Sequence, residues 1–283
     1  MPLTGAAELV GAACTAGRGL AAVNVIGLEH AEGIIAGAEA AGAGVVLQIS
    51  ENCVAYHGSL APIGTAVLAA ARAAAVPVAV HLDHATSGEL VREAAALGFG
   101  SVMYDASVLP YADNVRVTAD MTAWCHDQGV FVEAELGEIG GKDGVHAAGA
   151  RTDPAQAAEF VKETGVDALA VAVGSSHAMQ TRDAVLDLAL VRRIRAAVPV
   201  PLVLHGSSGV PDDALSAAVA AGLTKINMAT QLNKVFTAAV RNCLAGDAAM
   251  TDPRRYLSAG RDAVAAEVTH LLGVLRADAG NLV

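Results

Sequence analysis

Cysteine and aromatic residues are scarce in this sequence, and each shortage excludes a class of protein. The four cysteines, Cys14, Cys53, Cys125 and Cys243, are far apart and form no C-x-x-C pair. That spacing argues against a disulfide framework and a thiolate metal site, and it is consistent with a reducing, cytoplasmic location. Aromatic residues make up only 3% of the chain, so the core has to be built mainly from Ala, Val, Leu and Ile.

Basic residues and long apolar segments are lacking too. The chain has 18 Lys and Arg against 29 Asp and Glu, a formal net charge of -11, whereas nucleic-acid-binding proteins usually carry a basic patch. No uninterrupted apolar run reaches the roughly 18 to 20 residues of a membrane span, and the N-terminus has no signal-peptide pattern. We therefore expect no nucleic-acid or membrane partner. A small anionic substrate stays open, because a few backbone N–H groups at helix N-termini can bind one.

What the sequence does contain is an alternation of short β-rich apolar runs with longer Ala-rich segments of helical periodicity. This pattern is typical of α/β proteins in which repeated βα units surround a parallel sheet. Because about 250 residues is a usual size for one such barrel, the sequence predicts a single (β/α)8 TIM barrel as one domain over residues 1–283. The eight runs are residues 21–26, 44–50, 76–82, 98–104, 129–136, 166–173, 200–205 and 223–228.

Helical segments lie between these runs and after the last of them. Residues 87–97, 153–164, 184–197 and 211–221 can each form a helix with one apolar stripe. After the eighth run, residues 231–245 and 254–277 predict a C-terminal helical extension that is interrupted by a polar break.

Histidines stand where three of the predicted strands end. In β/α barrels the C-terminal ends of the strands carry the active site, and His84, His177 and His205 follow three different strands. They would converge above the mouth of the barrel and form an open three-imidazole site suited to catalytic zinc, with the fourth position left to substrate. Such a metal polarises a carbonyl and stabilises the charge formed when the adjacent carbon loses a proton. A single histidine is more often structural, but three at strand ends favour a site.

Two further features accompany the histidines. Asp83 directly precedes His84 and could reach the same cavity, where it would move a proton to or from a substrate hydroxyl. Glycine-containing turns at residues 174–176 and 206–209 offer N–H groups and hydroxyls to an anion. This combination favours a phosphorylated substrate.

Buried carboxylates are the remaining polar signal. Glu133 and Glu135 fall on one face of a predicted buried strand, so both need partners. Asp105 ends another strand and is either a neighbour of the metal site or a plain hydrogen-bond acceptor. His81 is expected to line the barrel or to support the site from behind.

Five segments resemble the signatures of class II ketose-bisphosphate aldolases, of the fructose- or tagatose-bisphosphate type, and they follow the family's order through nearly the whole chain. The segments are residues 81–84 (HLDH), 101–107 (SVMYDAS), 133–137 (EAELG), 170–174 (AVAVG) and 202–209 (LVLHGSSG). The resemblance implies reversible aldol cleavage of a ketose 1,6-bisphosphate to dihydroxyacetone phosphate and glyceraldehyde 3-phosphate. It also implies a zinc-dependent homodimer or homotetramer.

The resemblance assigns roles to individual residues. It implies that His84, His177 and His205 bind zinc. It makes Asp83 the proton donor at the cleaved carbon–carbon bond and links Glu135 to an alternative, buried metal position. A monovalent cation, Na+ or K+, near the phosphate loops is also common in the family. The residues expected to hold the dihydroxyacetone-phosphate half are Ala178, Gly206, Ser207, Ser208, Asn227, Met228, Ala229 and Thr230.

The chain departs from the family's pattern in two loops. Ala178 follows His177 where the family usually has glycine, so the backbone contact expected there is less free to adjust. The loop at residues 140–144 is one residue shorter than usual and lacks the glutamate thought to remove the ketone-side proton. Asp143, or Glu138 upstream, is the candidate replacement base, although either could be a plain solvated carboxylate.

One further position bears on which sugar is cut, and another on the far phosphate. Ala229 stands where fructose-specific relatives commonly carry an aspartate, and the apolar residue resembles the tagatose type. Because a buried carboxylate is left unpaired by the wrong epimer, its absence predicts loose discrimination. Arg254 resembles the family arginine that can clamp the far phosphate, sometimes across a subunit boundary, but an ordinary surface arginine at a helix start is the favoured interpretation.

Other functions fit parts of the same pattern. Lys225 falls on the last predicted strand and could form a Schiff base in a metal-free aldolase, which would leave the three histidines idle. A zinc hydrolase on a barrel is a second alternative, but such sites usually draw ligands from the first strand, which here ends without one. A related aldolase could release a different aldehyde. The altered loop also allows a non-catalytic sugar-phosphate-binding barrel.

Overall fold

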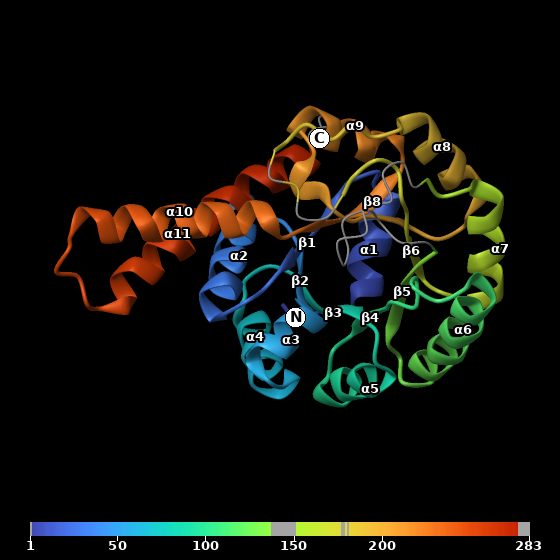
Figure 1. Cartoon of the computed structure of the whole chain (residues 1–283), viewed down its shortest axis with the longest axis horizontal. Helices are drawn as coiled ribbons and strands as arrows, with labels where there is room; N and C mark the ends of the chain where they lie inside the picture. Colours follow the sequence, from blue (N-terminus) through green and yellow to red (C-terminus); the bar gives the residue numbers. More distant parts are fainter. Residues whose placement is uncertain (1, 137–150, 177–178, 180, 277–283) are drawn as a thin grey trace.

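Eight parallel strands close into a barrel in the computed structural model, which describes residues 2–136, 151–176, 179 and 181–276. Each strand pairs with the next along the chain and β8 pairs with β1, so the sheet has no open edge (Figure 1). The strands are β1 (Leu20–Asn24), β2 (Val45–Ser50), β3 (Val78–Ala85), β4 (Ser101–Tyr104), β5 (Phe131–Glu135), β6 (Ala168–Ala170), β7 (Leu202–Leu204) and β8 (Leu223–Met228).

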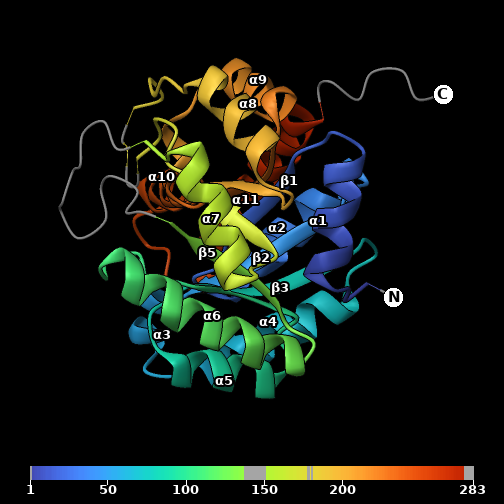
Figure 2. The same ribbon diagram turned by 90° about the vertical axis from the view of Figure 1, so that its right-hand side faces the viewer.

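The helices surround the barrel, cover the end at which its strands begin and extend it at the C-terminus (Figure 2). α1 (Ala6–Thr15) packs against β1, β3 and β8, and α10 (Thr230–Gly246) and α11 (Pro253–Leu275) form the C-terminal extension. The others described around the barrel are α2 (Leu28–Ala41), α3 (Glu51–His57), α4 (Leu60–Ala73), α5 (Gly88–Leu97), α6 (Tyr111–Asp127), α7 (Pro154–Thr164), α8 (Leu188–Ala197), the 3-10 turn η1 (Ser207–Gly209) and α9 (Asp212–Ala221).

Each of the eight predicted apolar runs overlaps one strand, so the predicted TIM barrel with its C-terminal helical extension is confirmed. β8 has the predicted bounds, whereas β6 and β7 are shorter than the runs 166–173 and 200–205 that contain them. The reason is that Val166, Val171 and Val173, beyond the paired part of β6, are also buried. An apolar run records burial, and only part of a buried segment pairs with a neighbouring strand.

Capping residues set the starts of two helices close to the predicted positions. Oδ1 of Asp153 accepts the N–H groups of Ala155 and Gln156, both at 2.9 Å, and thereby caps α7. Asp252 caps α11 in the same way. Each of these aspartates is followed by a proline, which is tolerated in the first turn because its missing N–H has no helical partner there.

The interior of the barrel changes from apolar at one end to polar at the other. Near the N-terminal ends of the strands, a small apolar cluster packs against α1; it includes Leu20, Ala22, Val46 and Ala79. Side chains two residues apart on a strand share a face, so the inward-facing residues that follow are Asn24, Gln48 and His81. This polar layer lies directly below the mouth of the barrel, where the site is expected.

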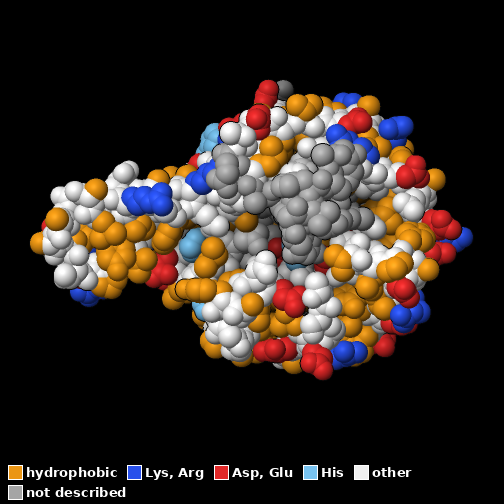
Figure 3. Space-filling model, viewed as in Figure 1, with side chains coloured by type: hydrophobic (Ala, Val, Ile, Leu, Met, Phe, Trp, Pro, Cys, Tyr) orange, Lys and Arg blue, Asp and Glu red, His pale blue; other side chains and the backbone are white. Residues whose placement is uncertain are grey.

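α10 and α11 form a helical arm that projects from one side of the barrel (Figure 1). At its base, Phe236 stacks on His30 of α2 with ring centroids 4.6 Å apart. Burial lowers the pKa of His30, so this histidine stacks as the neutral ring. Further along, hydrophobic side chains gather on the surface of the arm (Figure 3), and Leu244 is one of the exposed ones.

Among the helices that the structure describes, none taken singly is long and apolar enough to cross a membrane. The pair Glu51–His57 and Leu60–Ala73 meets that test only jointly, by length and composition, and is bent by 113°.

Candidate active site

A cavity of about 180 Å³ opens at the C-terminal ends of the strands. A larger groove of about 480 Å³ between α2 and α4 is lined mainly by alanine, so it offers little for catalysis. The cavity is polar by contrast. Its lining residues are Asn24, Ser50, Asn52, Asp83, His84, Gly206, Ser207, Ser208, Asn227, Ala229 and Thr230.

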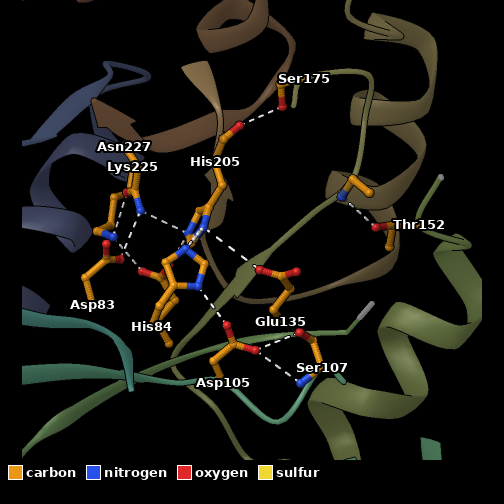
Figure 4. Close-up of polar contacts among 12 residues, drawn as sticks. Asp83, His84, Asp105, Ser107, Glu135, Thr152, Ser175, His205, Lys225 and Asn227 are labelled. Carbon is orange, nitrogen blue, oxygen red and sulfur yellow. Dashed lines mark hydrogen bonds and ion pairs between the residues drawn. The ribbon is translucent and has the colours of Figure 1, made fainter. Parts of the chain in front are cut away.

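Two of the predicted metal-binding histidines face each other in this region. Nε2 of His84 lies 3.0 Å from Nδ1 of His205 (Figure 4). The other nitrogen of each ring is next to a carboxylate: Nδ1 of His84 is 2.7 Å from Asp105, and Nε2 of His205 is 2.8 Å from Glu133. A carboxylate beside one ring nitrogen holds the proton there and leaves the opposite nitrogen as a lone-pair donor.

This arrangement fits a divalent metal ion. The facing nitrogens of His84 and His205 and a carboxylate oxygen of Asp83 can be chosen so that all lie within 4.8 Å of one another. Imidazole nitrogens are the ligands that zinc prefers in catalytic sites, and a carboxylate behind each imidazole is the usual support. The donor set that the structure brings together therefore agrees with zinc.

The charge around His84 points the same way. Burial lowers the pKa of His84, but the negative charges of Asp83 and Asp105 outweigh it and raise the pKa to about 9. A position with this surplus of negative charge favours a cation, whether a proton on the ring or a metal ion beside it.

An unusual backbone conformation lets Asp83 and His84 serve one cavity. Consecutive residues of a strand normally point to opposite faces. His84 has a φ of 50°, the only positive φ of a non-glycine residue in the described chain, and the pairing of β3 with β4 shifts between Leu82 and Ala85. Strain of this kind costs on the order of 1–3 kcal/mol and is typically found at functional sites. The irregularity accounts for two neighbouring side chains lining the same cavity.

Two amides hold the buried carboxylate of Asp83, one on each oxygen. Nδ2 of Asn24 donates to Oδ2 at 3.0 Å, and Nδ2 of Asn227 donates to Oδ1 at 3.4 Å. The amide of Asn24 is itself oriented by Gln48, whose Nε2 donates to its Oδ1 at 2.8 Å. Asp83 is therefore fixed at the cavity wall.

A second group of possible metal ligands adjoins the first. His84, Asp105 and Glu135 offer atoms that lie within 4.8 Å of one another. Oε2 of Glu135 is also 3.9 Å from Nδ1 of His205. Asp105 accepts hydrogen bonds from N and Oγ of Ser107 at 3.1 and 2.7 Å, which leaves its other oxygen to His84. Asp105 is thus a neighbour of the candidate metal site.

The turn after β7 approaches the loop after β6 very closely. Gly206 has a φ of 66°, and a Cβ on it would lie 2.5 Å from the backbone of Ser176, so only glycine fits. Oγ of Ser175 donates to the carbonyl oxygen of His205 at 2.6 Å (Figure 4). The segment that leads toward residue 177 is therefore tied to the strand end that carries His205.

The start of α10 closes the other side of the same turn. Oγ of Ser207 donates to the carbonyl of Asn227, and Oγ of Ser208 accepts the N–H of Gln231 at 3.2 Å. Ala229 and Thr230 lie at this helix start and line the cavity. N–H groups of a first helical turn favour an anion, so the turn and the helix start can bind a phosphate.

Some predicted site residues lie elsewhere. The side chain of Met228 is 2% exposed and adjoins a separate small cavity, so only its backbone could contact a substrate. Arg254 lies at the start of α11, and its side chain is 89% exposed and paired with Asp252 at 2.7 Å; it does not line the cavity of its own chain. Outside the described residues are His177, Ala178, Glu138 and Asp143.

Lys225 is not placed as a Schiff-base nucleophile. Its Nζ is 2.8 Å from Oε2 of Glu133 and 2.8 Å from Oδ1 of Asn227, and the side chain is buried. An ammonium held by a carboxylate is a poor nucleophile. Glu133 in turn has the partners that a buried carboxylate needs. His81 lines the barrel, with Nδ1 2.8 Å from Oγ of Ser101, and burial lowers its pKa well below the ordinary value.

Three polar residues of the cavity wall, Asn24, Ser50 and Asn52, have no role among the sequence predictions. Each lies at or just after the C-terminal end of β1 or β2. The positional rule that singled out the histidines also applies to uncharged residues and would have found them. Ser50 is easily mistaken for a plain helix cap, because its Oγ accepts the N–H of Cys53 at 3.2 Å.

Comparison with known proteins gives one consistent family. A family model described as fructose-bisphosphate aldolase class-II matches residues 4–279. A fructose-bisphosphate aldolase of Geobacillus stearothermophilus is 41% identical over 249 residues, 87% of each chain. One of Staphylococcus epidermidis is 37% identical over 268 residues, 93% of this chain and 94% of that one.

Two solved structures share the whole architecture. The YdjI aldolase from Escherichia coli K12 superposes with a TM-score of 0.83 at 32% identity, covering 96% of this chain and 97% of that one. A putative fructose-1,6-biphosphate aldolase from Coccidioides immitis superposes with a TM-score of 0.85 at 29% identity, covering 95% of each chain.

Proposed function

We propose a residue-level mechanism for this chain, which belongs to the class II fructose-bisphosphate aldolase family. The chain is a carbon–carbon lyase that catalyses reversible aldol cleavage, and members of the family are generally zinc-dependent. The substrate we assign is a ketose 1,6-bisphosphate of the fructose or tagatose type. The observation that carries the residue assignment is the facing pair of His84 Nε2 and His205 Nδ1 beside Asp83.

Zinc is the metal that we assign to this pair. His84 would hold it through Nε2 and His205 through Nδ1, because Asp105 and Glu133 engage the opposite nitrogens. His177 is the proposed third ligand, which completes the open three-imidazole site typical of catalytic zinc. When bound, zinc supplies a Lewis acid that draws charge from the ketose carbonyl oxygen.

Asp83 moves the proton of the bond that is made or broken. In the cleavage direction the C3–C4 bond breaks, the Asp83 carboxylate takes the proton of the C4 hydroxyl, and C4 becomes the aldehyde carbon. The electron pair of the broken bond stays on C3 of the dihydroxyacetone-phosphate half. In the reverse direction Asp83 returns the proton to the aldehyde oxygen. The hydrogen bonds from Asn24 and Asn227 keep the carboxylate in position for both directions.

The phosphate of the dihydroxyacetone-phosphate half is assigned to the turn after β7. Gly206, Ser207 and Ser208 supply N–H groups and hydroxyls, and the start of α10 adds the favourable end of a helix dipole. A monovalent cation, Na+ or K+, beside the same loops would balance the remaining phosphate charge.

A separate acid–base group has to donate a proton to C3 after cleavage and remove it in the reverse direction, and we assign this role to Asp143. Asp143→Ala is expected to slow the exchange of the dihydroxyacetone-phosphate C–H proton with solvent by about 10²-fold or more, the scale of losing a positioned acid–base group. Proton NMR in deuterated water measures the exchange directly. Glu138→Ala is the matched control in the same loop. A slowed exchange in the control with a normal rate in Asp143→Ala would transfer the role to Glu138.

We also infer that the chain forms a homodimer or homotetramer. The arm carries exposed apolar side chains such as Leu244, which a second copy would cover. Arg254 lies on the same arm and does not line the cavity of its own chain. If it clamps the far phosphate, it does so in a neighbouring subunit.

Ala229 sets an expectation for sugar selectivity. It lines the cavity where a carboxylate would accept hydrogen bonds from substrate hydroxyls. Without that acceptor, the fructose and tagatose bisphosphates are expected to differ by less than about 10²-fold in kcat/KM, and Ala229→Asp should widen the difference. Steady-state kinetics on both sugars test this, with Ala229→Asn as a control of similar size without charge. A larger preference in the unmodified enzyme would show that another residue reads the aldehyde half.

A further inference from the structure

Lys225 is a buried charged residue beneath the site that the mechanism above does not use. It lies on β8 with its side chain 2% exposed, and it does not line the cavity. Burying an ammonium in a barrel core is costly unless it is paired and hydrogen-bonded. Its two partners, Glu133 and Asn227, each contact a residue of the site: Glu133 contacts His205, and Asn227 contacts Asp83. Its position therefore calls for a functional explanation.

Lys225 fixes the orientation of the side-chain amide of Asn227, its first partner. Nζ of Lys225 donates to Oδ1 of Asn227 at 2.8 Å. The amide nitrogen consequently points the other way, to Oδ1 of Asp83 at 3.4 Å and to Nε2 of His205 at 3.0 Å. The reverse orientation would set an NH2 group against the ammonium and an oxygen against a carboxylate, and both contacts are repulsive. Lys225 thus decides which end of Asn227 meets Asp83.

Through Glu133, its second partner, Lys225 fixes the tautomer of the His205 ring. Oε2 of Glu133 is 2.8 Å from Nζ of Lys225, and its Oε1 is 2.8 Å from Nε2 of His205. The ammonium balances a carboxylate that is 0% exposed and holds its rotamer. Oε1 is then aimed at His205 and keeps the ring proton on Nε2. The Asn227 amide nitrogen is 3.0 Å from the same ring atom, but the charged acceptor of Glu133 is closer and forms the stronger hydrogen bond. Nδ1 is left to face His84.

We propose that Lys225 is a positioning residue that sets both halves of the site at once: the Nε2–H tautomer of His205 on the metal side and the Asn227 amide on the Asp83 side. It touches neither substrate nor metal. The catalytic half of this proposal rests on the proposed function, whereas the tautomer is a property of the metal-free protein. An experiment can therefore contradict the tautomer without contradicting the proposed function, and the reverse.

The direct test reads the tautomer of His205 by ¹⁵N NMR in metal-free protein labelled at histidine. The wild type is expected to carry the proton on Nε2, and Lys225→Met is expected to show a mixture or the Nδ1–H form. Zinc affinity, measured by competition with a chelator, should fall about 10-fold or more, the scale of losing a supporting partner of a ligand. Thr224→Val is the control, because Thr224 is equally buried and adjacent on β8. It should change neither quantity.

A wild-type tautomer together with unchanged zinc affinity in Lys225→Met would overturn the proposal. If Lys225→Met does not fold, the charge-balanced pair Glu133→Gln with Lys225→Met is compared with Glu133→Gln alone. Only the double variant also removes the hydrogen bond from Lys225 to the Asn227 amide. At saturating zinc and substrate its kcat is expected to be at least about 10-fold lower than that of the single variant. Equal values of kcat would show that Lys225 only balances the charge of Glu133.

Discussion

His84→Ala and His205→Ala are each expected to abolish tight zinc binding and to lower kcat/KM by more than about 10³-fold. The reason is that each change removes one of the three proposed ligands and, with the metal, a Lewis-acid contribution of several kcal/mol. We expect the same kind of effect from both variants. In each histidine one ring nitrogen faces the other histidine, at the proposed metal position, and the other nitrogen lies next to a carboxylate. Elemental analysis and a cleavage assay on the same sample measure both effects.

His126→Ala is the matched control for these variants. His126 is also a histidine beside a carboxylate, with Nε2 3.0 Å from Asp167, but it lies on α6 at the surface. It should keep its zinc and its activity. Zinc retained at the wild-type stoichiometry in His84→Ala or His205→Ala would remove that residue from the metal site.

Asp83→Ala is expected to lower kcat by about 10² to 10⁴-fold while zinc content and folding are unchanged, the scale of losing a positioned acid–base group. Asp83→Asn should lose nearly as much, because an amide fills the same space but cannot take the proton of the C4 hydroxyl. The comparison separates proton transfer from positioning. Rates are measured at saturating zinc and substrate, and zinc content by elemental analysis.

Two outcomes would contradict this role for Asp83. An Asp83→Asn enzyme with nearly the wild-type rate would show that the residue only orients its neighbours Asn24 and Asn227. Loss of zinc from both variants would instead make Asp83 a ligand, since its carboxylate lies within reach of the same point as the two histidines.

Most of the barrel could be predicted from the sequence because its strands are buried on both faces. Each run of apolar residues marks one strand, and β8 was predicted with its observed bounds. The site was partly predictable for a similar reason. The C-terminal ends of parallel strands meet at one end of a barrel, so residues as far apart as His84 and His205 were expected together, and they lie side by side.

The sequence could not predict how the site residues are oriented. The positive φ of His84, which lets it share a cavity with Asp83, has no local signal such as glycine. The pairing of Lys225 with Glu133 depends on side chains that cross the barrel interior from β8 to β5, and no spacing rule along the chain gives such a contact. This explains why Lys225 looked like a possible nucleophile in the sequence, whereas the structure shows it held between two partners.

The most direct test of the account is zinc content measured beside cleavage activity, before and after removal of the metal. The purified protein is expected to hold about one zinc ion per chain at the site of His84 and His205 and to cleave a ketose bisphosphate. A strong chelator should remove both properties, and added zinc should restore both. Full activity in metal-free protein, with borohydride trapping the substrate on Lys225, would contradict the account.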